Sequence, residues 1–166
     1  MAARKRKEYG EYIVSDSKIC GGDLTFKGTR VLVKDVLYYV AKGKDWDWIP
    51  KAYDGRLSHE AIAEAVELAR EALAASTENE EQVMAARKRK EYGEYIVSDS
   101  KICGGDLTFK GTRVLVNDVL YYVAQGKDWD WIVSGYHGIS REAIAKAISL
   151  ASESLIAKVE TRRRAA

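Results

Sequence analysis

This 166-residue chain is poor in several residue types, and each shortage excludes a class of protein. It has two cysteines, Cys20 and Cys103, at matching positions of an internal repeat, so one domain cannot hold a framework of disulfides. We therefore expect a reducing compartment, the cytoplasm. No apolar run approaches the roughly 20 residues of a membrane span, and none follows the basic N-terminus. We expect neither a membrane segment nor a secretory signal.

Residue patterns that carry catalysis or bind metal are also scarce. Histidine occurs twice, at His59 and His137, and neither has a cysteine or a second histidine at ligand spacing. Asp45 and Asp47 lack a third carboxylate nearby, which favours a helix cap and a first-turn acid over a metal site. The stretch GDLTFKGT places its lysine before the second glycine, unlike a phosphate-binding loop. The sequence predicts no enzyme and no cofactor or metal.

What the chain has instead is a repeat that restarts at Met84. Residues 1–49 match residues 84–132 at 47 of 49 positions. The two exceptions are Lys34 against Asn117 and Lys42 against Gln125. The remaining parts diverge, with one extra residue best placed at Arg56. A natural fusion, a recombination product and an engineered single-chain dimer all fit this pattern.

The repeat predicts two small tandem domains that form a pseudo-two-fold pair. They span 1–83, ordered at about 9–75, and 84–166, ordered at about 92–157. Their charges differ: the first carries 13 Lys+Arg and 15 Asp+Glu, the second 14 and 10. Basic residues cluster at Arg4, Lys5, Arg6 and Lys7, at Arg87, Lys88, Arg89 and Lys90, and at Arg162, Arg163 and Arg164. Such clusters contact phosphate or form solvated arms.

Local patterns predict the elements of each unit. EYIVSD reads as a strand, and LTF and TRVLV continue a ribbon through turns at Gly21 and Gly28. One helical face follows, with Gly43 as its stop; it consists of Val33, Val36, Leu37 and Val40. Asp45 can cap a second short helix, which tolerates Pro50 only in its first turn. We expect a buried Cys20.

The last helix is the clearest element. Ser58 and Ser140 can each cap one copy of it. Its core stripe is Ile62, Ala65, Val66, Ala69 and Leu73 in the first unit, and Ile144, Ala147, Ile148, Ala151 and Leu155 in the second. The predicted fold is mostly α, with a short β ribbon followed by three helices in each unit.

The words ICGG and KGTR, close together, are fairly specific in combination. The stretch IVSDSKICGGDLTFKGTRVLVKDVLYYVAKG, with LSHEAIAEAVELA after it, resembles the bacterial and archaeal family catalogued as domain of unknown function 433. The resemblance covers nearly all of residues 11–75 and 94–157. Family prolines are replaced by Ser17, Leu24 and Leu32. The resemblance implies a helix-turn-helix-like fold and an association with toxin–antitoxin operons, beside PIN-type nucleases.

Three functions are therefore open. The first is an antitoxin-like regulator that binds operator DNA through the two RKRK clusters, Arg141 and Lys146, because the last helix of the first unit is acidic. The second is a module that restrains a partner nuclease without binding DNA. Its candidate contacts are Trp46, Trp48, Trp129, Trp131, Arg162, Arg163 and Arg164; alternate spacing exposes one tryptophan of each pair. The third is a fused dimer with an assembly role, by intrachain pairing and further self-association.

Overall fold

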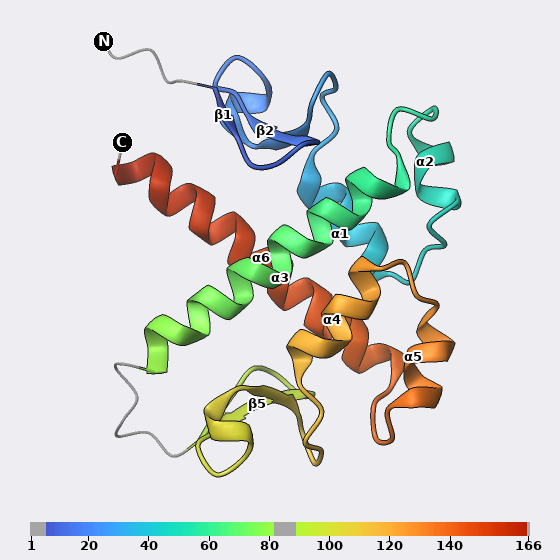
Figure 1. Cartoon of the computed structure of the whole chain (residues 1–166). Helices are drawn as coiled ribbons and strands as arrows, with labels where there is room; N and C mark the ends of the chain where they lie inside the picture. Colours follow the sequence, from blue (N-terminus) through green and yellow to red (C-terminus); the bar gives the residue numbers. More distant parts are fainter. Residues whose placement is uncertain (1–5, 82–88, 166) are drawn as a thin grey trace.

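The computed structural model describes residues 6–81 and 89–165, which form two similar units side by side (Figure 1). Each unit has a small antiparallel sheet at its outer end and helices toward the middle. The long helices α3 (His59–Glu81) and α6 (Arg141–Ala165) cross at the centre. The predicted class, a mostly α pair of tandem domains with a β ribbon before three helices, is confirmed.

Each sheet has a central strand with a neighbour on either side. In the first unit, β2 (Ile13–Ser15) lies between β1 (Lys7–Glu8) and β3 (Leu24–Phe26). In the second, β5 (Ile96–Asp99) lies between β4 (Arg89–Glu91) and β6 (Leu107–Phe109). Ile13 faces Phe26 across the first pair, and both side chains are buried, as are Val14 and Thr25 on the other face of the strands.

The third strand of the ribbon differs from the prediction. It is formed by the basic segment Lys7–Glu8 rather than by TRVLV. Only an isolated bridge joins Thr25 to Leu32 there. Gly28 forms the turn before this segment, with a φ of 75° in the left-handed region. The next helix already begins at Val33, inside TRVLV, so few residues remain between the turn and the helix to form a strand.

The cysteines lie at a tight turn in each unit. This turn is η1 (Cys20–Gly22) in the first unit and η2 (Cys103–Gly105) in the second. Cys20 has a φ of 48° and Gly21 a φ of 65°. The predicted burial of Cys20 is wrong, since both thiols are exposed. The turn lies at the outside of the ribbon, where a Cβ at Gly21 would meet nothing within 4 Å.

The helices α1 (Val33–Ala41) and α4 (Val116–Ala124) carry the predicted apolar face. Val36 and Val119 are fully buried, as the spacing of three and four residues requires. Each helix ends as predicted, at a glycine with positive φ, 68° at Gly43 and 71° at Gly126. The outer face of each helix is left for tyrosines.

Aspartates begin the short helices α2 (Trp48–Ala52) and α5 (Trp129–Gly135). The Asp45 carboxylate accepts the N–H of Asp47 at 2.8 Å, and Asp128 accepts that of Asp130 at 2.8 Å. Pro50 is the third residue of α2, within the first turn, where its missing N–H has no helical partner to lose.

The long helices start as predicted and run further than predicted. Ser58 Oγ accepts the N–H of Ala61, and Ser140 Oγ that of Ala143, both at 3.1 Å. All ten residues of the predicted core stripes are buried. Helix α3 continues to Glu81 and α6 to Ala165, past the residues near 75 and 157 at which the expected ordered parts end.

The extra length of these helices comes from contacts between the units. The second half of α3 packs against α4, and that of α6 packs against α1. Leu155 and Val159 of α6 are buried and line a cavity of about 70 Å³ with Val33 and Leu37 of the first unit. A helix of this length gains most of its stability from such packing, not from intrinsic propensity.

We predict that Leu155→Ala destabilises the whole chain by about 2–5 kcal/mol, because it leaves a cavity between α6 and α1. Denaturant unfolding followed by far-UV circular dichroism and by tryptophan fluorescence should give one coincident transition. Glu153→Ala, at an exposed position of the same helix, should change the unfolding free energy by less than about 0.5 kcal/mol. Two separate transitions in the wild type would contradict a shared core.

Candidate partner-binding surface

Four aromatic rings gather on the outer side of α1 and α2. We call Tyr38, Tyr39, Trp48 and Tyr53 the first aromatic patch. The Tyr39 ring centroid lies 5.3 Å from that of Trp48 and 5.5 Å from that of Tyr38. Tyr38 is 56% exposed and Trp48 is 40% exposed. The patch arises because Tyr38 falls off the apolar spacing of α1 while its neighbours turn inward.

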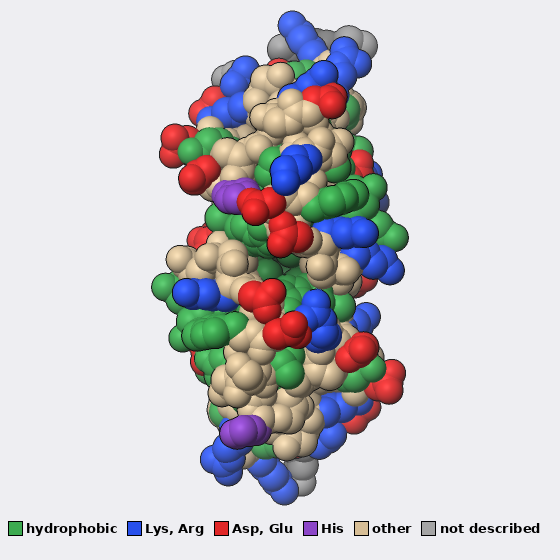
Figure 2. All heavy atoms as spheres, turned by 90° about the vertical axis from the view of Figure 1, so that its right-hand side faces the viewer, with side chains coloured by type: hydrophobic (Ala, Val, Ile, Leu, Met, Phe, Trp, Pro, Cys, Tyr) green, Lys and Arg blue, Asp and Glu red, His purple; other side chains and the backbone are tan. Residues whose placement is uncertain are grey.

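The second unit repeats this arrangement in its own four rings. Tyr121, Tyr122, Trp131 and Tyr136 form the second aromatic patch, with 5.3 Å between the Tyr122 and Trp131 centroids. Tyr121 is 45% exposed and Trp131 is 50% exposed. In Figure 2, hydrophobic side chains are exposed on both units of the face that carries α2 and α5.

Cationic side chains lie over the exposed rings of both patches, but in the second patch one of these side chains comes from the other unit. Lys42 Nζ is 5.3 Å from the Tyr38 centroid, and Lys44 Nζ is 4.9 Å from that of Trp48. Over the second patch, Lys127 lies above Trp131. The cation over Tyr121, at 5.8 Å, is Arg70 of α3. The first unit therefore supplies part of the second patch.

The other two tryptophans lie where the units meet. A Cβ at Gly126 would come within 3.3 Å of the Trp46 ring, and one at Gly43 within 3.4 Å of the Trp129 ring. Trp46 and Trp129 are half-buried, whereas Trp48 and Trp131 are exposed. The expectation that alternate spacing exposes one tryptophan of each pair is met, and the inner pair serves contact between units.

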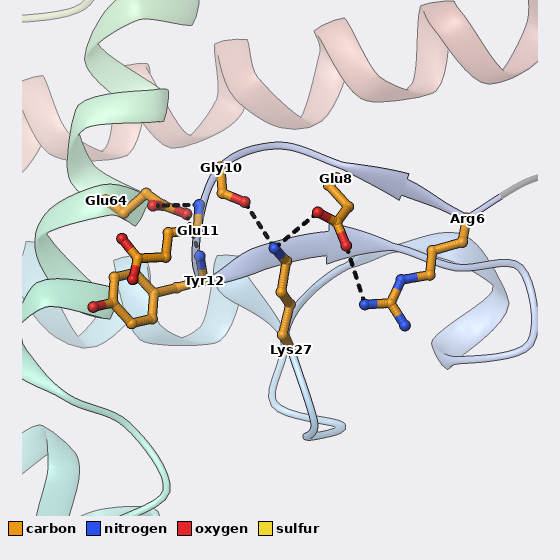
Figure 3. A network of polar contacts seen from close by, with 7 residues as sticks. All are labelled: Arg6, Glu8, Gly10, Glu11, Tyr12, Lys27 and Glu64. Carbon is orange, nitrogen blue, oxygen red and sulfur yellow. Dashed lines mark hydrogen bonds and ion pairs between the residues drawn. The ribbon is translucent and has the colours of Figure 1, made fainter.

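Arg6 and Lys7, the described part of the first RKRK cluster, make contacts within the ribbon. Figure 3 shows those of Arg6. Arg6 Nη2 lies 3.2 Å from Glu8 Oε1, and Lys27 donates to Glu8 at 3.1 Å and to the Gly10 carbonyl at 2.9 Å. The hydrogen bond from Lys27 lowers the pKa of the Glu8 carboxyl. Lys7 lies over the ring of Tyr9. Half of this cluster's charge is therefore balanced or stacked locally.

The second ribbon has the same pattern. Arg89 pairs with Glu91 and Asp99, and Lys90 Nζ is 4.7 Å from the Tyr92 centroid. The remaining predicted DNA contacts of the two clusters lie outside the described residues: Arg4, Lys5, Arg87 and Lys88. In Figure 2, Lys and Arg side chains gather at the two ends of the molecule.

The helix that would read a DNA groove has little free surface. Along α3 up to Thr77, only His59, Glu60 and Glu71 are exposed. Glu64 is turned toward the ribbon, where its oxygens accept the N–H groups of Glu11 and Tyr12, both at 2.9 Å (Figure 3). Of the acidic residues that the sequence places on this helix, Glu64 is therefore not free for a ligand, because it holds the β1–β2 turn.

The two candidate DNA contacts on α6, Arg141 and Lys146, already contact other residues of the chain. The Arg141 guanidinium pairs with Asp130 and lies 5.5 Å from the centroid of Trp129. Lys146 takes the place of Glu64 and packs on Gly93, where a Cβ would come within 3.0 Å of its Cε. The structure thus brings Arg141 to the seam between the units and Lys146 to the ribbon, away from one another.

The arginine run at the end of the chain is helical. Arg162 and Arg164 are exposed, whereas Arg163 donates to Asp23 of the first unit at 3.0 Å. Lys34 reaches the other Asp23 oxygen at 3.3 Å. Burial would raise the pKa of Asp23, but the hydrogen bonds from Arg163 and Lys34 outweigh it and lower that pKa. Arg163 is therefore a contact between units.

The tyrosines are the functional candidates that sequence reasoning missed. A signal was present, because Tyr38 and Tyr121 fall off the apolar spacing of their helices. Within residues 6–81 and 89–165, no three His, Cys, Asp or Glu side chains lie close enough together to hold a metal ion. No helix in the same part of the chain is long and apolar enough to cross a membrane.

Comparison with known proteins gives one match. The model of the family described as Protein of unknown function (DUF433) matches residues 13–69 and again residues 96–151. No curated protein and no solved structure matches the chain.

The contact with Arg163 predicts that the stability of the chain depends on pH through the Asp23 carboxyl. A lowered pKa contributes stability above the unfolded value near 3.8, and that contribution is lost as pH falls through the folded pKa. At pH 7 we expect Asp23→Asn to lower the unfolding free energy by ~0.2–1 kcal/mol, since the pair is partly exposed.

Thermal unfolding of Asp23→Asn, Asp106→Asn and the wild type between pH 2 and 7 checks this. The difference between Asp23→Asn and the wild type should shrink below about pH 4. Arg163→Ala should reproduce the loss, whereas Arg162→Ala should not. Equal effects at Asp23 and Asp106 would show that the Arg163 contact contributes nothing.

Proposed function

Because this chain belongs to the DUF433 family, whose members are proteins of unknown function, we propose its role from its own surfaces. It is an antitoxin-like binding protein that restrains a partner nuclease through its two aromatic patches. It performs no catalysis itself, and works in the cytoplasm. The partner is a protein of the PIN-type nuclease class that the family resemblance implies.

The exposure of Tyr38, Trp48, Tyr121 and Trp131 supports this proposal. Large aromatic rings that remain near half exposed cost free energy in water, and grouped apolar patches usually mark binding sites. Tyrosine, tryptophan and arginine are also the residues that contribute most binding energy at protein interfaces. Lysines over the rings add a polar rim, which such interfaces also have.

Because the chain has two patches, we expect the partner to have either two equivalent surfaces or one extended surface that contacts both patches. They lie on matching elements of the two units, α1 with α2 and α4 with α5. Two linked contacts raise affinity without any new interaction, provided that both engage together. A nuclease dimer offers two equal surfaces to such a pair.

Operator DNA is a second candidate ligand, favoured by the position of basic strands at both ends of the molecule. Arg6 and Lys7 on the first unit match Arg89 and Lys90 on the second. Two matching basic sites suit the two half-sites of an operator. The narrow exposed face of α3 means that such contacts would be made to phosphates by the strands and not to bases by a recognition helix.

The patches predict which substitutions abolish partner binding. Tyr38→Ala and Tyr121→Ala should each weaken the complex with the proposed PIN-type nuclease partner by about 10-fold or more. Isothermal titration calorimetry with an inactive nuclease measures this, and unchanged thermal unfolding shows that each variant folds. Arg56→Ala, an exposed residue outside the patches, should bind normally. Wild-type affinity in both tyrosine variants would reject the aromatic surface.

The basic strands predict a salt-dependent interaction with upstream DNA. Mobility shifts at several salt concentrations should give a linear plot of log K against log salt. Replacing Arg89 and Lys90 by alanine should reduce that slope by up to about 2 if both contact phosphate. Lys51→Ala, an exposed lysine of α2, should leave the slope unchanged. Absence of any shift at low salt would remove DNA from consideration and leave the nuclease proposal intact.

A further inference from the structure

The two differences within the duplicated 49 residues both lie where one unit meets the other. At the first, Asn117 Oδ1 accepts a hydrogen bond from Arg70 Nη1 of α3 at 2.9 Å. At the second, Gln125 lines a cleft together with Trp46 and Glu60 of the first unit. Identity elsewhere makes these positions informative, because nothing else distinguishes the α4 surface from that of α1.

The matching contact on the other side of the molecule is built differently. There α6 of the second unit crosses α1 of the first, and Lys34 stands at the place of Asn117. The residue of α6 that aligns with Arg70 is Ser152, which is neutral and short. Lys34 therefore meets no arginine at the place of Arg70, and it shares the Asp23 carboxylate with Arg163 from further along α6, at 3.3 Å and 3.0 Å.

Arg70 is held in place and cannot easily turn away. Its Nε donates to Glu67 at 3.0 Å, its Nη2 contacts the other Glu67 oxygen, and its guanidinium lies over Tyr121. Its side chain is only 20% exposed. A lysine at the position of Asn117 accepts no hydrogen bond, so the Arg70 Nη1 donor would lose its partner. Its ammonium would also lie against a fixed guanidinium, with Glu67 and Asp106 nearby to reduce the repulsion only in part.

We propose that Arg70 and the residue at the equivalent positions 34 and 117 determine which units can pack together; we call this combination the pairing code. Arg70 packs stably against a helix with asparagine at this position, as in the second unit, and not against one with lysine, as in the first. Two first units brought together would place Arg70 of each against Lys34 of the other. The first unit is therefore barred from pairing with a second copy of itself and fits a unit of the second kind.

This inference stands independently of the proposed function, and it adds to the account of the second patch. Because only the mixed pair places Arg70 beside Asn117, it also places that guanidinium over Tyr121. A pair of second units would have Ser152 there and no cation. The two aromatic patches are consequently unlike, because the cation over Tyr121 comes from the first unit.

The test introduces the forbidden combination into the full-length chain. Asn117→Lys should lower the Tm by roughly 3–8 °C, and the loss should shrink at high salt. Lys34→Asn is the matched control, because it makes the reverse exchange against Ser152 and should shift the Tm by no more than ~2 °C. Arg70→Ser in the Asn117→Lys background should recover most of the lost Tm.

The double-variant cycle separates the pairing code from a local effect on α4. Lysine in the first turn of a helix is mildly unfavourable with any partner, so that part of the loss persists without Arg70. If the pairing code is right, Asn117→Lys lowers the Tm clearly more when residue 70 is arginine than when it is serine. Equal costs in the two backgrounds would overturn the proposal, as would a loss unaffected by 1 M salt.

Discussion

The crossing of α3 and α6 holds the two units together. The second half of each helix lies against the other unit, that of α3 against α4 and that of α6 against α1. Buried alanines such as Ala69 and Ala151 leave room for these helices to approach closely. A unit of about 80 residues buries too little surface to be very stable alone. Sharing one core across the crossing gives both units the burial that neither has by itself.

The same crossing decides which surfaces remain for function. It covers most of the helix that would otherwise read DNA, and it leaves α1, α2 and their counterparts at the outside. The tyrosines and tryptophans there are exposed because the inner faces of these short helices are already filled. Basic residues of the ribbons are turned mainly to their own acids and rings. The balance of surfaces favours a protein partner over a nucleic acid.

The two units share most of their sequence and yet play unequal parts. Arg163 of the second unit pairs with Asp23 of the first, and Arg70 of the first unit contacts Asn117 and Tyr121 of the second. Glu64 pins one ribbon turn by accepting N–H groups, whereas Lys146 packs on the other. These differences come almost entirely from the diverged second halves, and they act on surfaces that are nearly identical. An asymmetric pair results from a symmetric scaffold.

Short-range patterns predicted the elements correctly, because the apolar face of α1 around Val36, the serine caps and the glycine stops depend on neighbours a few residues apart. The prediction was wrong for TRVLV, where α1 already begins at Val33, and for Cys20, which is exposed at a turn with a left-handed backbone. The packing of Leu155 on α1 of the other copy and the pairing of Arg163 with Asp23 come from the three-dimensional arrangement of the units. Two identical segments present the same apolar spacing, so periodicity cannot tell a contact within a unit from one between units.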